Sequence, residues 1–132
     1  MKSKKEIIID TNFFFIPFHF NIDIIDEFKK TFPGYKLVTT NFIIDELVGL
    51  KKNSKGKDRI NSSLALKLAK SDKINLINID LKENEQVDDA LIRISNIIAT
   101  NDKELRIKAR KREIAIIYLR QKKFLELDGY LH

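Results

Sequence analysis

Acidic residues follow or flank several short apolar runs of this chain, and together they could bind a divalent cation. Asp10 ends the run Ile7–Ile9, Asp102 follows a second such run, and Glu46 and Asp89 occur between them. Because the carboxyl ends of parallel strands meet at one edge of a sheet, we expect these acids to converge there. Clustered carboxylates repel one another, and Mg²⁺ or Mn²⁺ relieves that repulsion. The set predicts metal-assisted phosphodiester hydrolysis.

Composition narrows the chemistry further. The 132 residues carry a net charge of +6 and contain no cysteine, which excludes disulfides and thiolate zinc sites. The two histidines, His19 and His132, are too few for a histidine-rich metal site, so any metal must be held by oxygens. A basic chain with a carboxylate cluster suggests a polyanionic partner.

Length and hydropathy set the expected organisation of the chain. We expect one domain over residues 1–132, with 43% hydrophobic residues supplying its core. No apolar stretch approaches the length of a transmembrane helix, and no signal-peptide core follows the first residues, so we expect a cytoplasmic location.

Strand-like and helix-like segments alternate along the chain, which predicts a parallel sheet with right-handed crossovers. We expect strands at residues 6–10, 35–39, 73–79, 96–100 and 114–119, helices at residues 21–31, 42–51, 60–71, 87–94 and 103–112, and a short tail after residue 120.

The helix over residues 42–51 predicts where its acids point. On a helical wheel, Ile43, Leu47 and Leu50 form a buried stripe. Glu46 lies on the margin of that stripe and can face a cleft, whereas Asp45 is expected to face water. At the start of the helix near residue 87, the wheel does not choose between Asp88 and Asp89.

Two segments have both structural and functional interpretations. The run Phe13–Phe20 holds five phenylalanines, and we expect it to pack in the core; base stacking or a dimer contact is the alternative. His19 within it is expected to be a packed or surface residue. The basic segment 51–59 is expected to be a loop that contacts phosphate or is simply solvated. We predict phosphate contacts from the residues Lys55, Lys57, Lys103 and Arg106.

Four motifs in order resemble PIN-domain ribonucleases over nearly the whole chain. Asp10-Thr-Asn12 resembles the opening motif of that family, Ile44-Asp-Glu46-Leu resembles the second, and Ala99-Thr-Asn-Asp102 resembles the fourth. The third motif resembles residues 87–92, where the register Asp-Ala-Leu-Ile selects Asp89. The segments 98–105 and 118–120 resemble archaeal members related to rRNA-processing nucleases, and VapC-type toxins share the acidic set.

This resemblance implies a PIN-like three-layer α/β/α fold with a central parallel sheet of about five strands. It implies an endoribonuclease that cleaves single-stranded RNA with Mg²⁺ or Mn²⁺, in rRNA processing or as the VapC-type toxin of a toxin-antitoxin pair. Asp10, Glu46, Asp89 and Asp102 would hold the metal and orient the attacking water, and Asn12 and Thr100 would hydrogen-bond behind them. The expected partners are RNA, a second copy of the chain, and an antitoxin or ribosome-assembly protein.

The spacing of the last two motifs departs from the family pattern. Asp89 and Asp102 are 13 positions apart, which leaves little chain for a crossover between parallel strands. Either the crossover is abbreviated or residues are missing from it, unless residues before Asp89 contribute.

Other functions remain as alternatives. The fold could serve as a non-catalytic RNA-binding or assembly module, although retention of all four acids argues against this. A phosphatase with Asp10 as nucleophile is disfavoured because such enzymes commonly carry a second Asp two positions later, where this chain has Asn12.

Overall fold

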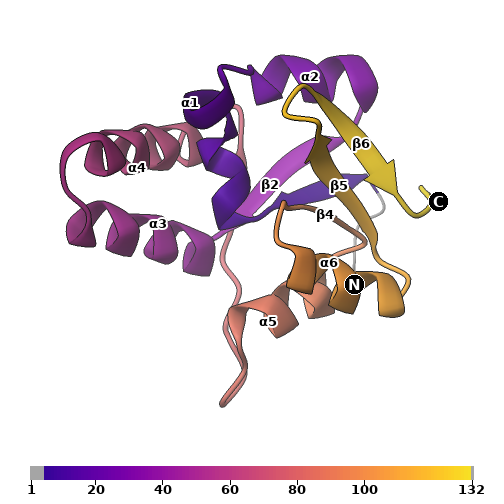
Figure 1. Ribbon diagram of the computed structural model, residues 1–132. Coiled ribbons are helices and arrows are strands. Elements are labelled where there is room, and N and C mark those ends of the chain that lie inside the picture. The colour runs from indigo at the N-terminus through magenta and orange to yellow at the C-terminus, as the bar shows by residue number, and fades with distance from the viewer. Residues whose placement is uncertain (1–4, 132) are drawn as a thin grey trace.

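A computed structural model describes residues 5–131 and shows a six-stranded sheet flanked by helices (Figure 1). Residues 1–4 and His132, which belong to the expected domain, lie outside the described residues. The strands are β1 (Glu6–Ile9), β2 (Lys36–Thr40), β3 (Asn75–Ile77), β4 (Ile97–Ala99), β5 (Ala115–Arg120) and β6 (Phe124–Asp128). The helices are the 3-10 helix η1 (Thr11–Phe15), α1 (Ile16–Phe20), α2 (Ile24–Thr31), α3 (Asn41–Asn53), α4 (Gly56–Ala69), α5 (Val87–Ile94) and α6 (Lys103–Lys111).

The order of the strands creates a switch point in the middle of the sheet. The order is β3-β2-β1-β4-β5-β6, and β1 to β5 are all parallel. The chain therefore builds outward from β1 on one side and then returns to add β4 and β5 on the other. In open α/β sheets, ligands bind beyond the carboxyl ends of the strands at such a point. Here that point lies between β1 and β4.

β1 is the buried centre of the sheet. Ile7 and Ile9 have no exposed surface and Ile8 is 2% exposed, as expected for a strand covered on both faces. β1 pairs with β2 on one side and with β4 on the other, where Ile9 lies opposite Ala99. The backbone amide of Asp10 continues this ladder and donates to the carbonyl of Ala99 at 2.9 Å. Asp10 is thereby fixed at the strand end.

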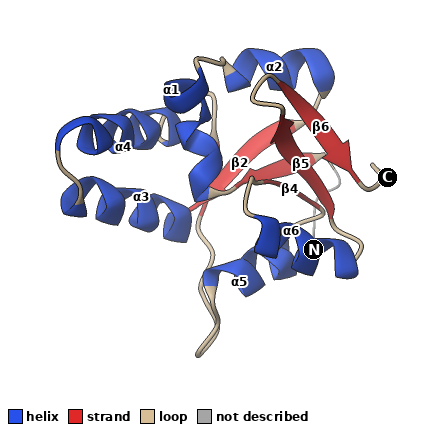
Figure 2. Ribbon diagram, in the orientation of Figure 1, coloured by secondary structure: helices blue, strands red, loops and turns tan. Residues whose placement is uncertain are grey.

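Helices cover both faces of the sheet (Figure 2). In this view α5 and α6 lie below the strands, α1 and α2 lie above them, and α3 and α4 form a pair at the side. Thr40 ends β2 and begins α3 by accepting a hydrogen bond from the amide of Ile43 at 3.2 Å. The expected α/β/α layering with a parallel sheet is confirmed. Within residues 5–131, no helix combines the length and apolar character needed to span a bilayer.

The sixth strand is a difference from the sequence-based expectation. Residues after 120 were expected to form a tail, but β6 pairs antiparallel with β5. The turn between them has Gln121 and Lys122 in the left-handed region, at φ 53° and 57°. Hairpin turns of this kind are usually marked by Asn or Gly. The Gln-Lys pair gives no such signal in the sequence.

The segment between α3 and α4 also differs from its prediction. Helix α3 continues to Asn53 and α4 begins at Gly56, so most of the expected basic loop 51–59 is helical. Lys51, Lys52 and Lys57 lie on helices rather than in a loop. Gly56 has a positive φ of 58° and permits the sharp reversal between the two helices.

The crossover into β4 uses residues that precede Asp89. The connection from β3 to β4 runs over residues 78–96, and its first part is an extended segment before α5 (Figure 1). This length is sufficient for a parallel crossover. The short spacing between the last two acidic motifs is accommodated because the segment before α5 spans the distance from β3, on the far side of β2, back to β4.

Candidate active site

A pocket of about 500 Å³ opens at the carboxyl edge of the sheet, at the switch point between β1 and β4. It is lined by acidic side chains from four separate parts of the chain and by several aromatic side chains from η1 and α1. The lining residues are Asp10, Thr11, Asn12, Phe15, Ile16, His19, Phe20, Glu46, Leu50, Asp88, Asn101 and Asp102.

Asp10 is held rigidly at the floor of this pocket. It is 6% exposed, and both of its carboxylate oxygens accept hydrogen bonds. Oδ1 accepts from the backbone amide of Thr11 at 2.8 Å. Oδ2 accepts from the hydroxyl of Thr100 at 2.8 Å and from the Asn12 amide at 3.0 Å. Asn12 and Thr100 thus hydrogen-bond to an acidic residue, as predicted from the sequence, and their role in a reaction stays a prediction.

The pKa of Asp10 is raised from 3.8 to about 6. Burial is the largest cause, because desolvation disfavours the charged carboxylate. The hydrogen bonds from Thr100 and Thr11 lower the pKa but do not compensate, and the charges of Glu46 and Asp88 raise it further. The fold therefore brings negative charges close together at Asp10 although they repel one another.

Asn12, Thr100 and Asn101 join the strand ends to one another. The amide nitrogen of Asn12 donates to Thr100 Oγ1 at 3.2 Å, and its Oδ1 accepts from the backbone of Asn101 at 3.0 Å. Thr100 Oγ1 also accepts from the amide of Asp102 at 3.1 Å. Asn101 Oδ1 accepts from the amide of Leu119 in β5 at 2.9 Å. This network fixes the ends of β1, β4 and β5 relative to one another.

Glu46 reaches the pocket from α3, as its place on the helical wheel predicts. Its Oε1 accepts a hydrogen bond from the Thr11 hydroxyl at 3.1 Å. Its pKa is raised, first because of partial burial and then because of the charge of Asp88. Leu50 differs from its prediction: it is 46% exposed and lines the pocket instead of the core.

The structure places Asp88, and not Asp89, in the acidic pocket. Asp88 lines it, and its pKa is raised by partial burial and by the nearby charge of Asp102. Asp89, chosen from the resemblance, lines a different groove between α5 and α6, where it lies 3.9 Å from Lys108 Nζ. One helical step of about 100° turns the two side chains to different sides of α5.

Asp102 lies at the pocket and begins α6. Its Oδ1 accepts hydrogen bonds from the amides of Glu104 at 2.9 Å and Leu105 at 3.4 Å, which is the usual role of an N-terminal capping residue. The same residue lines the pocket, so its carboxylate position is set by the helix start. Capping thus orients one of the four acids.

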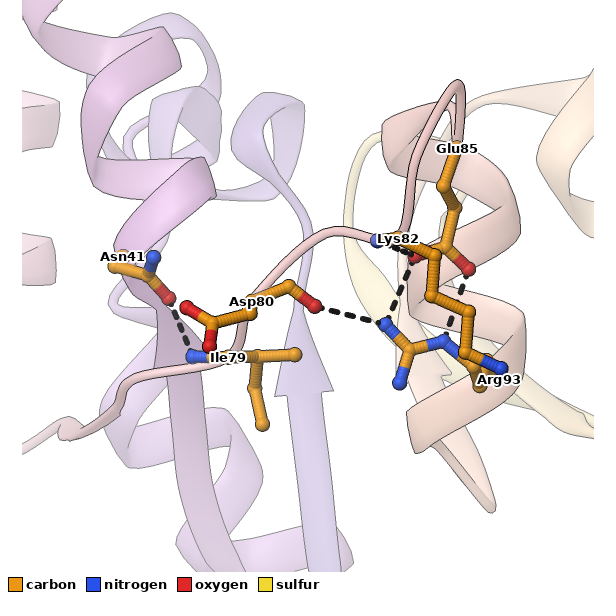
Figure 3. Close-up of polar contacts among 6 residues, drawn as sticks. All are labelled: Asn41, Ile79, Asp80, Lys82, Glu85 and Arg93. Carbon is orange, nitrogen blue, oxygen red and sulfur yellow. Dashed lines mark hydrogen bonds and ion pairs between the residues drawn. The ribbon is translucent and has the colours of Figure 1, made fainter.

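Polar contacts at two places hold the segment that leads to Asp88 (Figure 3). Near its start, the amide of Ile79 donates to Asn41 Oδ1 at 2.7 Å. Near its end, Arg93 on α5 donates to both carboxylate oxygens of Glu85, at 2.9 and 2.8 Å, and to the carbonyl of Asp80 at 3.1 Å. The Arg93 pair, with a backbone bond from Lys82, lowers the pKa of Glu85 to about 2. The segment is thereby clamped at both ends.

The acids fit a hard divalent cation in donor type and charge. Asp10, Glu46, Asp88 and Asp102 offer oxygens alone, and the first three have raised pKa values, first because of burial and then because other negative charges are close. Across residues 5–131, no three His, Cys, Asp or Glu side chains are grouped tightly enough to hold a metal ion as they stand. The fit is one of chemistry and not of a finished coordination shell.

The residues predicted to contact phosphate differ in their positions and contacts in the structure. Arg106 is engaged elsewhere: it donates to Asp128 at 2.8 Å and lies 3.9 Å from the centre of the Tyr118 ring. Lys103 is exposed in the first turn of α6, next to Asp102. Lys55 and Lys57 are exposed at the start of α4 and do not line the pocket.

Several pocket residues were missed from the sequence. Thr11 is not among the predicted site residues, although it lies between two that are, Asp10 and Asn12. Its hydroxyl, next to an acidic motif, is the feature that could have identified it. Asn101 is likewise absent from the predicted site residues, although it lies between Thr100 and Asp102, which are both among them.

The run Phe13–Phe20 is predicted to pack in the core, with base stacking or a dimer contact as the alternative, and His19 is predicted to be a packed or surface residue. Nothing in the spacing of Phe15 and His19 distinguishes a pocket wall from a core.

The fold and the pocket together define a class of protein. An acidic pocket at the switch point of a parallel sheet, with helices on both faces, is the architecture of a PIN nuclease. The chain belongs to the PIN like domain family, which it matches over residues 7–122. The resemblance predicted from the four motifs is therefore confirmed.

Curated relatives agree with this family. The chain is 32% identical over 132 aligned residues to Ribonuclease VapC4 of Methanocaldococcus jannaschii, covering 94% of this chain and 97% of that protein. It is 27% identical over 122 residues to Ribonuclease VapC9 of Archaeoglobus fulgidus, covering 91% and 88%. Both relatives are archaeal, as the resemblance indicated. The solved structure of the PIN domain endonuclease Utp24 superposes with a TM-score of 0.76 at 22% identity, covering 98% of this chain and 96% of that one.

The raised pKa of Asp10 predicts how stability changes with pH when metal is absent. The folded value of about 6 exceeds the ordinary 3.8, so the stabilising contribution is complete below about pH 4 and is lost as pH rises through 6. The contribution is at most about 3 kcal/mol. Urea unfolding at pH 5, 6 and 7 in EDTA should show falling stability, with a smaller fall in Asp10→Asn. An identical pH dependence in both proteins would contradict this account.

Removing the Arg93 clamp should loosen the segment that leads into α5. In Arg93→Ala, we expect faster amide hydrogen exchange in residues 80–86, with exchange in β1 unchanged. Arg120→Ala is the matched control because it removes another Arg–Glu pair, with Glu126, in the β5–β6 hairpin. Unchanged exchange in residues 80–86 would show that the clamp does not hold this segment.

Proposed function

We propose that this protein is an endoribonuclease that hydrolyses phosphodiester bonds in single-stranded RNA with Mg²⁺ or Mn²⁺. The observation that carries the proposal is the meeting of Asp10, Glu46, Asp88 and Asp102 in one pocket, with raised pKa values for the first three. The names of the two relatives, both ribonucleases, support RNA as the substrate.

The residues of the chain divide the work of the site. When bound, a divalent cation supplies Lewis-acid stabilisation of negative charge on the phosphate. Thr100 and Asn12 donate hydrogen bonds to Asp10, and Thr11 donates one to Glu46, so these carboxylates are oriented before substrate arrives. Preorganised groups of this kind lower the reorganisation needed during reaction. Asp102 is oriented by α6, and Asp88 by the clamped segment.

The biological role favoured by the comparisons is that of a VapC-type nuclease. Both curated relatives carry that name, and the chain matches almost their full length. In that role the protein would act as the toxin of a toxin-antitoxin pair, with an antitoxin as partner. The rRNA-processing role, with ribosome-assembly partners, stays a prediction, because 22% identity to Utp24 shows the fold alone. A second copy of this chain as partner also stays a prediction, as does cytoplasmic location.

A basic groove beside the acidic pocket supplies the proposed path for the RNA backbone. It has a volume of about 630 Å³, lies between α5 and α6, and includes Lys108, Lys111 and Arg112. Asp88 and Asp89 are neighbours on α5, so this groove and the acidic pocket lie on adjoining sides of one helix. Cations here are expected to contact phosphates, which fix position without reading sequence.

The first prediction of this function concerns Asp88 and Asp89. Labelled single-stranded RNA is incubated with purified protein in Mg²⁺, in Mn²⁺ and in EDTA. We expect cleavage that needs the metal, and a loss of at least about a hundredfold in Asp10→Asn and in Asp88→Asn. Asp89→Asn is the matched control and should retain most activity, because it removes an exposed contact only.

The outcomes separate the alternatives. If metal-dependent cleavage is retained in Asp88→Asn but lost in Asp89→Asn, then Asp89 and not Asp88 is the third acidic residue of the active site. Tight RNA binding without cleavage by any metal-loaded form would favour the non-catalytic binding module. Circular dichroism of each variant shows whether it has kept its fold.

A further prediction concerns salt. RNA binding by the Asp10→Asn variant should weaken steeply as salt increases, because phosphate contacts release counterions. Lys111→Ala and Arg112→Ala should each reduce the slope of log K against log salt by about one. Lys67→Ala, an exposed lysine on α4, is the control and should leave the slope unchanged. An equal effect of all three substitutions would show that charge alone, and not the groove, determines binding.

A further inference from the structure

The phenylalanine-rich run is divided by the structure into two groups with different surroundings. Phe13 and Phe14 have no exposed surface and belong to the core. Phe15 and Phe20 are only half-buried, His19 is exposed, and all three line the acidic pocket. Phe13 and Phe14 lie wholly within the core, whereas Phe15 and Phe20 pack against it with only part of their surface and line the pocket with the rest.

The three pocket residues form a continuous aromatic wall, which we define as Phe15, His19 and Phe20. The ring centres of Phe15 and His19 are 5.5 Å apart with planes 30° apart, so the rings are stacked. His19 meets Phe20 edge-on, with centres 6.2 Å apart. These contacts hold the His19 ring in place while leaving it accessible. Leu50 of α3 adds a further apolar group to the same pocket and is 46% exposed.

Phosphate binding and hydrolysis give no reason for such a wall. A scissile phosphate and its cation need oxygen ligands and positive charge, which the four acids and a metal supply. The aromatic surface that stays exposed beside them would be stabilised by a flat apolar group that covers it during function. In a single-stranded nucleic acid, the group covalently attached next to each phosphate is a nucleobase, which has such a face.

We propose that the aromatic wall is a nucleobase subsite, in which an unpaired base of the substrate stacks on His19 next to the bond to be cleaved. This inference rests on the proposed function, because it requires RNA in the pocket. It names what the pocket binds besides the phosphate. The commitment to a base comes from continuity, since the wall and the carboxylates line one pocket of about 500 Å³.

The proposed subsite has a consequence for specificity. Every base has a π-face, so stacking tolerates sequence but favours the bases that stack most strongly. We therefore expect purines to be held better than pyrimidines at this position. A double-stranded region should be excluded, because its bases are already stacked and paired.

Fluorescence offers a direct test because the chain contains no tryptophan. In the Asp10→Asn background, which keeps the RNA intact, His19→Trp places a single indole in the wall. With Mg²⁺ present, oligoadenylate should quench this indole more strongly than oligouridylate of equal length. Inorganic polyphosphate, which has the charge but no base, should not quench it. Tyr130→Trp, at a residue 77% exposed and outside the pocket, is the control and should respond to none of them.

Affinity measurements complete the test. In the same background, His19→Ala should weaken binding of labelled oligoadenylate about five- to a hundredfold, the range found when one stacking partner is removed. The effect on oligouridylate should be smaller. His19→Phe keeps an aromatic face and should restore most of the affinity. Tyr130→Ala is the matched control and should change neither value.

Each contrary outcome has a definite meaning. If labelled RNA binds but the indole of His19→Trp responds to neither oligonucleotide, no base occupies the wall. The proposal is then overturned while the proposed ribonuclease function stands; a side chain of a partner protein would become the occupant to seek. Equal responses to polyphosphate and to oligoadenylate overturn it as well. If no RNA binds at all, both the subsite and the proposed function fall.

Discussion

The burial of one carboxylate is the constraint on which the rest of the site depends. Asp10 is placed by the end of β1 in the middle of the sheet, where its charge is poorly solvated. Thr100 and Asn12 donate to it and lower the cost of that charge, and both residues are themselves fixed by the neighbouring strand end. The repulsion that remains favours any cation that enters. Structural order and affinity for positive charge thus have one origin.

The same constraint explains which parts of the structure were predictable from sequence. An apolar run that stops at an acid is a local signal, so β1 with Asp10 and β4 with Asp102 could both be placed. The directions in which Asp88 and Asp89 point could not be predicted. A helical wheel gives the angle between the two side chains but not the rotation of α5 against its neighbours. That rotation is set by packing of Leu91, which is fully buried, and by the clamp at Arg93. The strand β6 was missed because its turn lacks Asn and Gly.

The site is assembled from elements of unequal rigidity. Asp10 and Asp102 come from strand ends in the core of the sheet, and Glu46 comes from the first turns of a long helix. Asp88 instead follows an extended segment, which is held in place by hydrogen bonds that include those of Asn41 with Ile79 and of Arg93 with Glu85 (Figure 3). Local opening is easiest where backbone is exposed and few apolar contacts form. Among the four acids, Asp88 is therefore the one whose position depends on polar contacts of an exposed segment as well as on core packing.

The hydrogen bond between Asn101 and Leu119 bears on when the protein can become active during synthesis. Asp10 is made early, but Thr100, whose hydroxyl donates to it, lies 90 residues later, and the neighbouring Asn101 is in turn fixed by the backbone of β5. Contacts between such distant residues form only after the intervening chain has been closed into a loop. A nascent chain on the ribosome consequently has no assembled pocket until β5 has emerged. If the protein is the ribonuclease proposed above, its activity is deferred until the chain is nearly complete.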